Sequence, residues 1–203
     1  MNLRRAVITL ACPLLLALCG CAPTVAPQAR PGKVLLFGTF SGTENGADVL
    51  RTPAAEFGWF AREVTLQFYD HLADDVAVPK ITVAVHKSGY FSSIVPASGY
   101  GINVQMPNRR VSLEHAITAT EPGKAYYLGH LHLDITRRNL FLVLCVCSYG
   151  TIDNLSFEDR LDSDLRWLEA EQGRERRREI VKSLPVPIEG SHPSVGVDCG
   201  CLR

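Results

Sequence analysis

The feature that most constrains this chain is a series of short apolar runs over residues 33–149, separated by turn residues about every ten positions. Runs of this length are typical of antiparallel strands, whereas a helix needs apolar residues at intervals of three and four. In some runs, such as residues 64–68, the apolar residues take every second position, so one face of the strand is buried. The sequence therefore predicts a mainly β fold, an antiparallel β-sandwich of about seven strands. The expected strands are Val34–Phe40, Val64–Tyr69, Ile81–His86, Phe91–Val95, Gly101–Met106, Tyr126–Ile135 and Leu140–Cys147.

One C-terminal amphipathic helix is expected after the strands. Leu161, Leu165 and Leu168 are spaced by four and three among charged residues, which places them on one helical face. Basic residues follow late in the same stretch, where cations complement the helix dipole. The sequence predicts a helix within residues 156–184.

The amino terminus is an export signal rather than part of the fold. Arg4 and Arg5 precede an apolar run over residues 6–18 that is too short to cross a membrane, and the sequence Leu-Cys-Gly-Cys follows at residues 18–21. This segment resembles the lipobox of bacterial lipoproteins. The resemblance implies a lipoprotein signal peptide, cleavage before Cys21, and acylation of Cys21 with palmitate-type chains that anchor the protein in a membrane.

The residue after the lipidated cysteine bears on location. Ala22, where some lipoproteins carry Asp, resembles lipoproteins exported to the outer membrane of Gram-negative bacteria. The resemblance implies a lipid anchor in the outer membrane that faces the periplasm, with the cell surface as the alternative. An ordinary secretory signal competes with this interpretation, but cleavage after Ala22 or Ala26 would leave a proline as the first residue.

These patterns divide the chain into five parts. Removal of the leader takes two of the 21 basic residues, leaving 19 against 21 acidic residues and a net charge of −2 with histidine neutral. That balance does not suggest nucleic acid as a partner. The expected parts are a signal peptide (1–20), a proline-rich tether (21–33), the β-sandwich (34–150), a helical C-terminal extension (151–190) and a cysteine-containing tail packed on the sandwich (191–203).

A turn between two expected strands carries a family resemblance. Residues 89–102 read Gly-Tyr-Phe-Ser-Ser-Ile-Val-Pro-Ala-Ser-Gly-Tyr-Gly-Ile, and residues 123–129 read Gly-Lys-Ala-Tyr-Tyr-Leu-Gly. These segments are similar to the Pro-x-Gly turn and Tyr-x-Ile strand of transthyretin-like domains, also called carboxypeptidase regulatory-like domains, and to a later strand of lipoproteins that carry this domain. The match covers about 55 to 60% of the chain. It departs from the pattern by one extra residue in the turn and by Val95 in place of Leu.

The resemblance implies a transthyretin-like sandwich, a fold that hosts adhesion, assembly and carrier roles without shared chemistry. The turn fits physically, because Pro96 has no amide to donate and Gly99 can take a positive φ, which would let the two strands reverse. Tyr100 and Ile102 are then expected to return to the core. A generic sandwich with a coincidental turn is the alternative.

Four cysteines remain beyond the leader and Cys21: Cys145, Cys147, Cys199 and Cys201. They form two Cys-x-Cys pairs, and within a strand both thiols of a pair share one face. Pairing Cys145 with Cys147 would close a small strained ring across ~6.6 Å, so we expect disulfides between the strand and the tail. The spacing does not choose between the two cross-pairings. The alternatives are thiol-redox exchange and a four-cysteine site for zinc or monovalent copper.

Two histidines are weak metal candidates. His130 and His132 are two apart on an expected strand and share a face with Asp134, a possible third ligand. Leu131 and Leu133 take the opposite face and are expected in the core. The histidines are therefore expected on the solvent face, which argues against a metal role.

The expected function is binding. The sequence lacks the common hydrolase, metalloprotease, phosphate-loop and dinucleotide motifs, so we expect no enzyme and no cofactor. A lipid-anchored binding or assembly module for a protein partner or an envelope glycan is the first hypothesis, and a metal-binding or thiol-redox protein is the alternative. The weak candidates for binding residues are Trp59, in an aromatic cluster with Phe57 and Phe60, and the basic run Arg176, Arg177 and Arg178.

Overall fold

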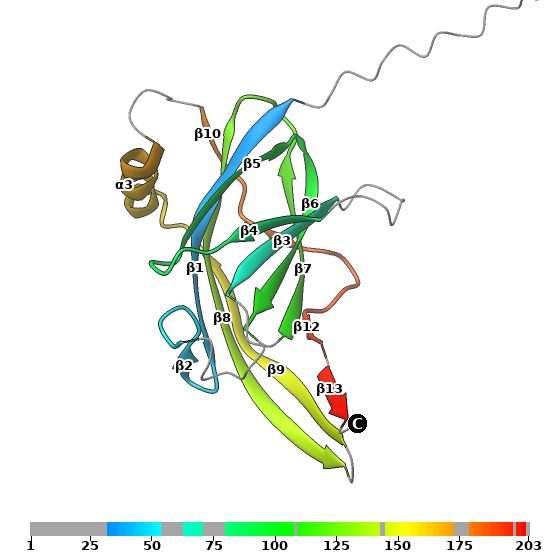
Figure 1. Ribbon diagram of the computed structural model, residues 1–203. Helices are drawn as coiled ribbons and strands as arrows, with labels where there is room; N and C mark the ends of the chain where they lie inside the picture. The colour runs from blue at the N-terminus through cyan, green and yellow to red at the C-terminus, as the bar shows by residue number, and fades with distance from the viewer. Residues whose placement is uncertain are drawn as a thin grey trace, which may run out of the picture. The chain divides into compact units, whose positions relative to one another are not determined.

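The computed structural model describes residues 32–53, 63–70, 80–107, 109–142, 145–172, 179–196 and 198–201. Most of these residues form strands, and one helix follows the longest strands (Figure 1). The elements are β1 (Lys33–Glu44), β2 (Ala47–Asp48), β3 (Thr65–Asp70), β4 (Ile81–Ala84), β5 (Tyr90–Pro96), β6 (Ser98–Met106), β7 (Arg109–Ala119), β8 (Ala125–Leu142), β9 (Cys145–Glu158), α3 (Leu161–Gln172), β10 (Ile180–Lys182), β11 (Val186–Pro187), β12 (Ser194–Val195) and β13 (Asp198–Cys201).

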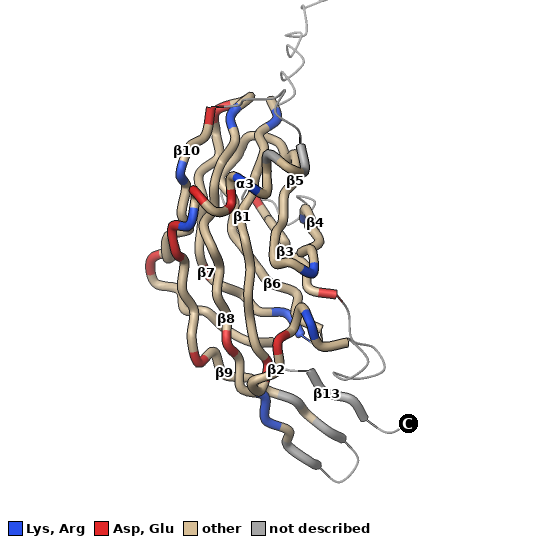
Figure 2. Tube along the Cα trace, turned by 90° about the vertical axis from the view of Figure 1, so that its left-hand side faces the viewer, with Lys and Arg blue, Asp and Glu red and all other residues tan. Residues whose placement is uncertain are grey.

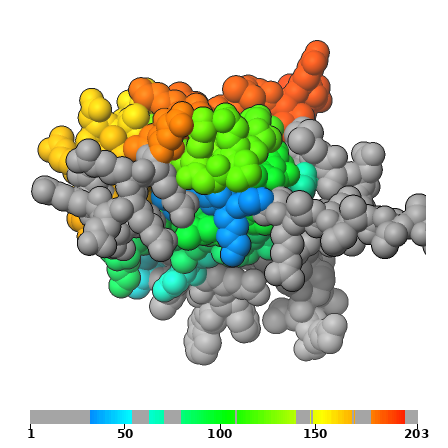
Figure 3. Space-filling model, turned by 90° about the horizontal axis from the view of Figure 1, so that it is seen from above, coloured from blue at the N-terminus to red at the C-terminus, as the bar shows by residue number. Residues whose placement is uncertain are grey.

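The strands form two sheets, which confirms the predicted β-sandwich. The first sheet has the order β13-β9-β8-β1-β2, with β5 paired to β1 and β10 paired to β8. The second has the order β11-β7-β6-β3-β4, with β12 paired to β7. Most pairs are antiparallel, as expected, but β1 and β10 both run parallel to β8. Seen from above, the orange segment around β10 lies against the yellow-green start of β8 (Figure 3).

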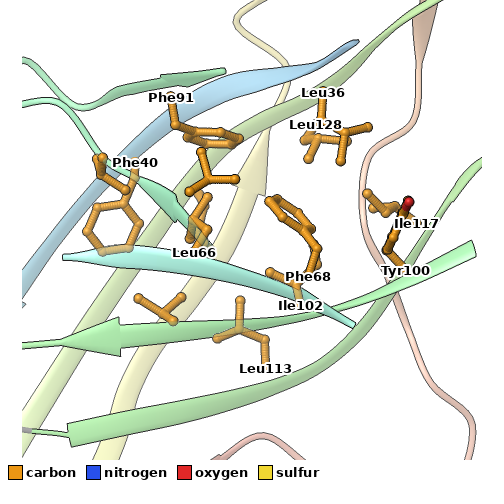
Figure 4. Close-up of a cluster of buried hydrophobic side chains, with 14 of the residues drawn as sticks. Leu36, Phe40, Leu66, Phe68, Phe91, Tyr100, Ile102, Leu113, Ile117 and Leu128 are labelled. Atoms are coloured by element: carbon orange, nitrogen blue, oxygen red, sulfur yellow. The ribbon is translucent and has the colours of Figure 1, made fainter. Parts of the chain in front are cut away.

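The main core lies between the two sheets and follows from the alternation of apolar residues. Leu36 and Phe40 of β1 point inward toward Leu66 and Phe68 of β3, and all four are at most 1% exposed (Figure 4). Burial of each such side chain contributes about 1.5–3 kcal/mol by removing apolar area from water. Tyr100 is also buried here, as the sequence predicts.

A second, smaller core lies on the outer face of the first sheet, under the helix. Leu35 and Phe37 of β1 and Tyr127 of β8 pack there with Leu168 of α3. Because β1 carries apolar residues on both faces in this stretch, it reads as a continuous run rather than an alternating one. The helix covers this part of the sheet and gives it a buried outer face.

One prediction about local structure is wrong. The strand predicted over Leu140–Cys147 is the end of β8 and the start of β9, two long strands that pair along a hairpin. The predicted helix is confirmed, because α3 (Leu161–Gln172) lies within residues 156–184 and follows the end of β9 at Glu158.

The Pro-x-Gly turn also differs from its expected form. β5 pairs with β1 whereas β6 pairs with β3 and β7, so the turn at Ala97 crosses from one sheet to the other. Gly99 does not take a positive φ. The expected reversal into a paired hairpin is wrong, because a chain that crosses between sheets needs only a bend here and no residue with a positive φ.

The structure also bears on membrane spanning. Within the residues described above, no helix has both the length and the apolar character needed to cross a bilayer.

Candidate functional site

A row of polar side chains lies on the outer face of the first sheet. The parallel register of β1 and β8 places three hydroxyl residues opposite three titratable residues. A β-bulge at Gly129, where φ is +87°, shifts this register and lets His130 face outward immediately after the buried Leu128. We call this row the polar stripe, and it consists of Thr39, Ser41 and Thr43 of β1 and His130, His132 and Asp134 of β8.

The end of the polar stripe next to α3 is centred on His130. Its Nδ1 lies 2.8 Å from Thr39 Oγ1, and its Nε2 lies 2.9 Å from Ser41 Oγ. Thr39 Oγ1 also donates to Asp164 Oδ2 of α3 at 3.1 Å. Asp164 is buried and accepts a second hydrogen bond from the Tyr127 hydroxyl at 2.8 Å. The stripe therefore connects β1 and β8 to the helix.

At the end of the polar stripe away from α3, a serine, a histidine and an aspartate contact one another in series. Ser41 Oγ lies 2.8 Å from His132 Nδ1, and His132 Nε2 lies 2.8 Å from Asp134 Oδ2. Thr43 Oγ1 donates to Asp134 Oδ1 at 2.8 Å. Asp134 is thus held beside His132, as the alternation of the strand predicts.

The surroundings shift the pKa values of side chains in and beside the polar stripe. Burial, followed by the positive charge of Arg160, lowers the pKa of His130. Burial pushes the pKa of Asp134 upward, but the hydrogen bonds from Thr43 and His132 outweigh it and hold that pKa below its ordinary value. Burial and the hydrogen bond to Asp164 raise the pKa of Tyr127. The Tyr127 hydroxyl therefore stays protonated.

The solvent-face prediction for the two histidines is wrong for His130. His130 is 7% exposed, because α3 and the segment before it cover this part of the sheet. The side chain of His132 is 30% exposed. All four ring nitrogens already lie within hydrogen-bond distance of a partner, and no group of three metal-ligating side chains occurs among the described residues.

A cavity of about 250 Å³ opens above the polar stripe, and we call it the polar pocket. The ring of Tyr90 forms one wall and stacks on Trp167 of α3 with centroids 4.5 Å apart. Charges of both signs stand around the pocket, and basic and acidic residues are interspersed over this side of the molecule (Figure 2). The lining includes Thr39, Ser41, Asp48, Arg51, Lys87, Ser88, Tyr90, His130, Arg160, Ser163 and Asp164.

The cysteines occupy facing positions on two paired strands. β13 pairs antiparallel with β9, and Cys199 lies opposite Cys147 while Cys201 lies opposite Cys145. The tail therefore runs along the strand that carries the first Cys-x-Cys pair, at the end of the β8–β9 hairpin (Figure 1).

Several predicted site residues lie outside the described residues. These are Cys21 with its leader and residues 22–31 of the predicted tether, Trp59 with its aromatic neighbours, and Arg176, Arg177 and Arg178. The last residue of the predicted tether, Lys33, begins β1. The hydroxyls of β1 were not among the predicted site residues, although Thr39, Ser41 and Thr43 alternate in a way that signals one polar face. Their histidine partners lie about 90 residues further along the chain, so only the register brings them together.

Fold and site define this chain as a two-sheet β-sandwich protein with a polar stripe partly covered by a helix. No protein-family model matches the sequence, and no curated protein matches it. Among solved structures, the chain is similar to the crystal structure of a DUF3823 family protein from Parabacteroides merdae. The sequence identity is 14%, the TM-score is 0.31, and the alignment covers 84% of this chain and 81% of that chain. A superposition this loose does not assign the chain to that family.

Proposed function

We propose that this protein is a lipid-anchored, non-enzymatic lipoprotein of the Gram-negative outer membrane that faces the periplasm and binds an envelope glycan. The anchor rests on the lipobox-like sequence that ends at Cys21 and on the proline-rich residues that follow it. The transthyretin-like assignment of the sandwich rests on the sequence resemblance around Pro96 and Tyr100.

The polar pocket carries the glycan proposal. Sugars present hydroxyls that both donate and accept hydrogen bonds, and the pocket offers hydroxyl, imidazole, carboxylate and guanidinium groups at close range. Tyr90 adds an aromatic ring, whose face or edge packs well against a sugar. A cavity of about 250 Å³ is smaller than pockets for drug-sized ligands, which span about 300–1,000 Å³, and suits a single sugar residue.

Titration calorimetry with soluble oligosaccharides released from the cell envelope tests this proposal. Tyr90→Ala should weaken binding at least tenfold, about 1.4 kcal/mol, because the variant removes the aromatic wall. Tyr149→Ala is the matched control, since Tyr149 is an exposed tyrosine of β9 outside the pocket lining. If no oligosaccharide binds, and crosslinking in cells instead captures a protein through residues of the pocket, the glycan proposal is wrong.

The lipid anchor is tested separately. Metabolic labelling with an alkyne-bearing fatty acid should mark the wild type, and Cys21→Ser should remove both the label and the membrane association. Cys147→Ser is the control, because this thiol lies beyond the expected lipidation site. An unlabelled wild-type protein would contradict the proposed anchor.

A hydrolase is the second candidate function, favoured by one observation. Ser41, His132 and Asp134 form two consecutive 2.8 Å contacts in the residue order of serine hydrolases, although here Ser41 contacts Nδ1 and Asp134 contacts Nε2, the reverse of the usual triad. Ser41 is also shared with His130, at 2.9 Å, so its single proton is not committed to His132. A fluorophosphonate probe separates the candidates: labelling lost in both Ser41→Ala and His132→Gln would favour the hydrolase.

We propose structural disulfides for the four cysteines, in the pairs Cys147–Cys199 and Cys145–Cys201. Directly opposite residues of antiparallel strands have Cα atoms about 4.5–5.5 Å apart, within disulfide range, whereas diagonal neighbours lie about 7–8 Å apart. Each bond releases two protons and two electrons, which a disulfide-bearing oxidant of the envelope accepts. The register supports this pairing over the diagonal pairing that the spacing alone leaves open.

Non-reducing mass spectrometry checks the cysteines. Trypsin should release residues 139–160 joined to residues 183–203 by two disulfides. Variants that keep only Cys147 with Cys199 should oxidise fully in a glutathione buffer, whereas variants that keep only Cys147 with Cys201 should retain free thiols. Four free thiols in the wild type, with bound zinc or copper, would favour the metal alternative, and reversible exchange with a thiol substrate would favour the redox alternative.

A further inference from the structure

Five contacts link Asp164 of α3 to Asp134 through four residues of the polar stripe, in a series that does not branch between the two carboxylates. These contacts measure between 2.8 and 3.1 Å, and each contact needs one proton between its two heavy atoms. In order, the members of the series are Asp164, Thr39, His130, Ser41, His132 and Asp134.

The protons of ordinary side chains do not suffice for these five contacts. Ionised Asp164 and Asp134 only accept, each hydroxyl supplies one proton, and each neutral imidazole supplies one. Two hydroxyls and two neutral imidazoles supply four protons in total. One contact would then bring two lone pairs together at hydrogen-bond distance. The count does not depend on which ring nitrogen of either neutral imidazole carries the proton, because each neutral ring supplies one proton in both tautomers.

We propose that the polar stripe is a proton-binding site that holds one additional proton, shared by His130 and His132 through the Ser41 hydroxyl and resting on His132. With this proton, His132 donates to both Ser41 and Asp134, Ser41 donates to His130, and His130 donates to Thr39. Every contact of the series is then satisfied. The proton reaches His130 when the Ser41 hydroxyl reverses its donor direction, and no heavy atom moves.

The charges around the two rings favour His132 as the resting place. His130 lies next to the cation of Arg160, which precedes α3, and is more buried than His132. His132 contacts the carboxylate of Asp134 directly. Further charged groups near the rings are Glu158 of β9, opposite His130, and Asp164 of α3, which accepts hydrogen bonds from the Thr39 and Tyr127 hydroxyls. Asp48, Arg51 and Lys87 also line the polar pocket beside His130.

The additional proton has a consequence for chemistry. An imidazolium cannot accept the proton of Ser41, so His132 is unavailable as a general base while the stripe is filled. This is a physical reason for the non-enzymatic assignment, although the proton count stands whether or not the polar pocket binds a glycan.

Nitrogen-15 spectra of protein labelled at histidine test the proposal on the full chain. At pH 7.5 an unperturbed histidine is about 10% protonated. We expect His132 to show two protonated ring nitrogens at this pH and His130 to show one, with signals assigned by His130→Gln and His132→Gln variants. Two neutral rings in the wild type would overturn the proposal.

Ser41→Ala is the decisive variant. Removing the hydroxyl splits the series of hydrogen bonds into two shorter series. Neutral imidazoles supply enough protons for each of them, so His132 should lose most of its additional proton at pH 7.5. A simple ion pair with Asp134 would instead keep His132 charged in Ser41→Ala, and that result would also overturn the proposal. Ser98→Ala is the matched control, because Ser98 lies on β6 of the second sheet and donates to Asp70 rather than to the stripe, and it should leave both signals unchanged.

Discussion

The guanidinium of Arg109 lies 3.4 Å from the carboxylate of Glu44, and the two side chains are 1% and 2% exposed. Glu44 ends β1 in the first sheet and Arg109 begins β7 in the second, so this ion pair joins the two sheets inside the sandwich. Gly150 makes room for it, since a Cβ there would lie 2.8 Å from Arg109 Nη1. Removing two charges from water is costly, and the pair is tolerated because each charge compensates the other.

Glu44→Gln should therefore destabilise the protein by about 3–5 kcal/mol, because it leaves a buried guanidinium without its anion. The double replacement of Glu44 and Arg109 by leucine should recover most of that loss. Urea unfolding measures the free energy of unfolding of both variants. Glu158→Gln is the control, because its ion pair with Arg160 is about half exposed and is worth about 1 kcal/mol or less.

The bulge of β8 should be intolerant of any side chain at Gly129. Gly129 has a φ of +87°, and a Cβ would lie 2.6 Å from Leu184 Cδ2 and 2.9 Å from the Glu158 carbonyl oxygen. Gly129→Ala should cost about 2–4 kcal/mol in the free energy of unfolding. Gly123→Ala is a matched control with a φ of +84° and nothing within 4 Å, and it should cost only about 1–2 kcal/mol. Equal losses in the two variants would show that crowding at the bulge is unimportant.

Alkaline stability should depend on Tyr100. Burial, followed by the charge of Asp70, raises the pKa of Tyr100 to about 12, against about 10 in the unfolded chain. The unfolded chain therefore loses this proton first, so the stabilisation is complete below pH 10 and is lost as the pH rises toward 12. Tyr100→Phe should flatten the fall in the urea midpoint over this range. A slope identical to that of the wild type would contradict the assignment.

Docking of α3 should depend on Leu168. This residue packs on Leu35, Phe37 and Tyr127, so Leu168→Ala should weaken helix docking by about 2–3 kcal/mol. Faster hydrogen exchange of the α3 amides and a change in the fluorescence of Trp167 would report it. Arg166→Ala, at an exposed position on the same helix, should change neither.

The sequence predicts those parts of the fold whose signals are local. Short apolar runs predict the positions of β1, β3, β4, β5, β6 and the start of β8, and in β3 and β4 the apolar residues also take every second position, as in a half-buried strand. The strand β7 was missed although Val111, Leu113 and Ile117 follow the same alternation. The Asn45-Gly46 turn between β1 and β2 was missed too, although both residues take positive φ and this dipeptide favours tight hairpins.

The site could not be predicted because it depends on which strand pairs with β8 and on which element covers that strand. Local alternation places His130 and His132 on one face, but it contains no information on which strand lies beside them. The parallel neighbour β1 supplies the hydroxyls, and α3 supplies Asp164 and covers His130. A prediction of solvent exposure made from one strand fails where a distant helix covers that strand.

The parallel pairing of β1 with β8 also bears on how the chain reaches its native state. β1 can pair early with β5, but its other edge has no partner until residues 125–135 have emerged, and contacts of such long sequence separation make folding slow. The final strand, β13, adds to β9 only when the last residues are present. A growing chain therefore exposes an open sheet edge for most of its synthesis, which makes assistance by a chaperone valuable.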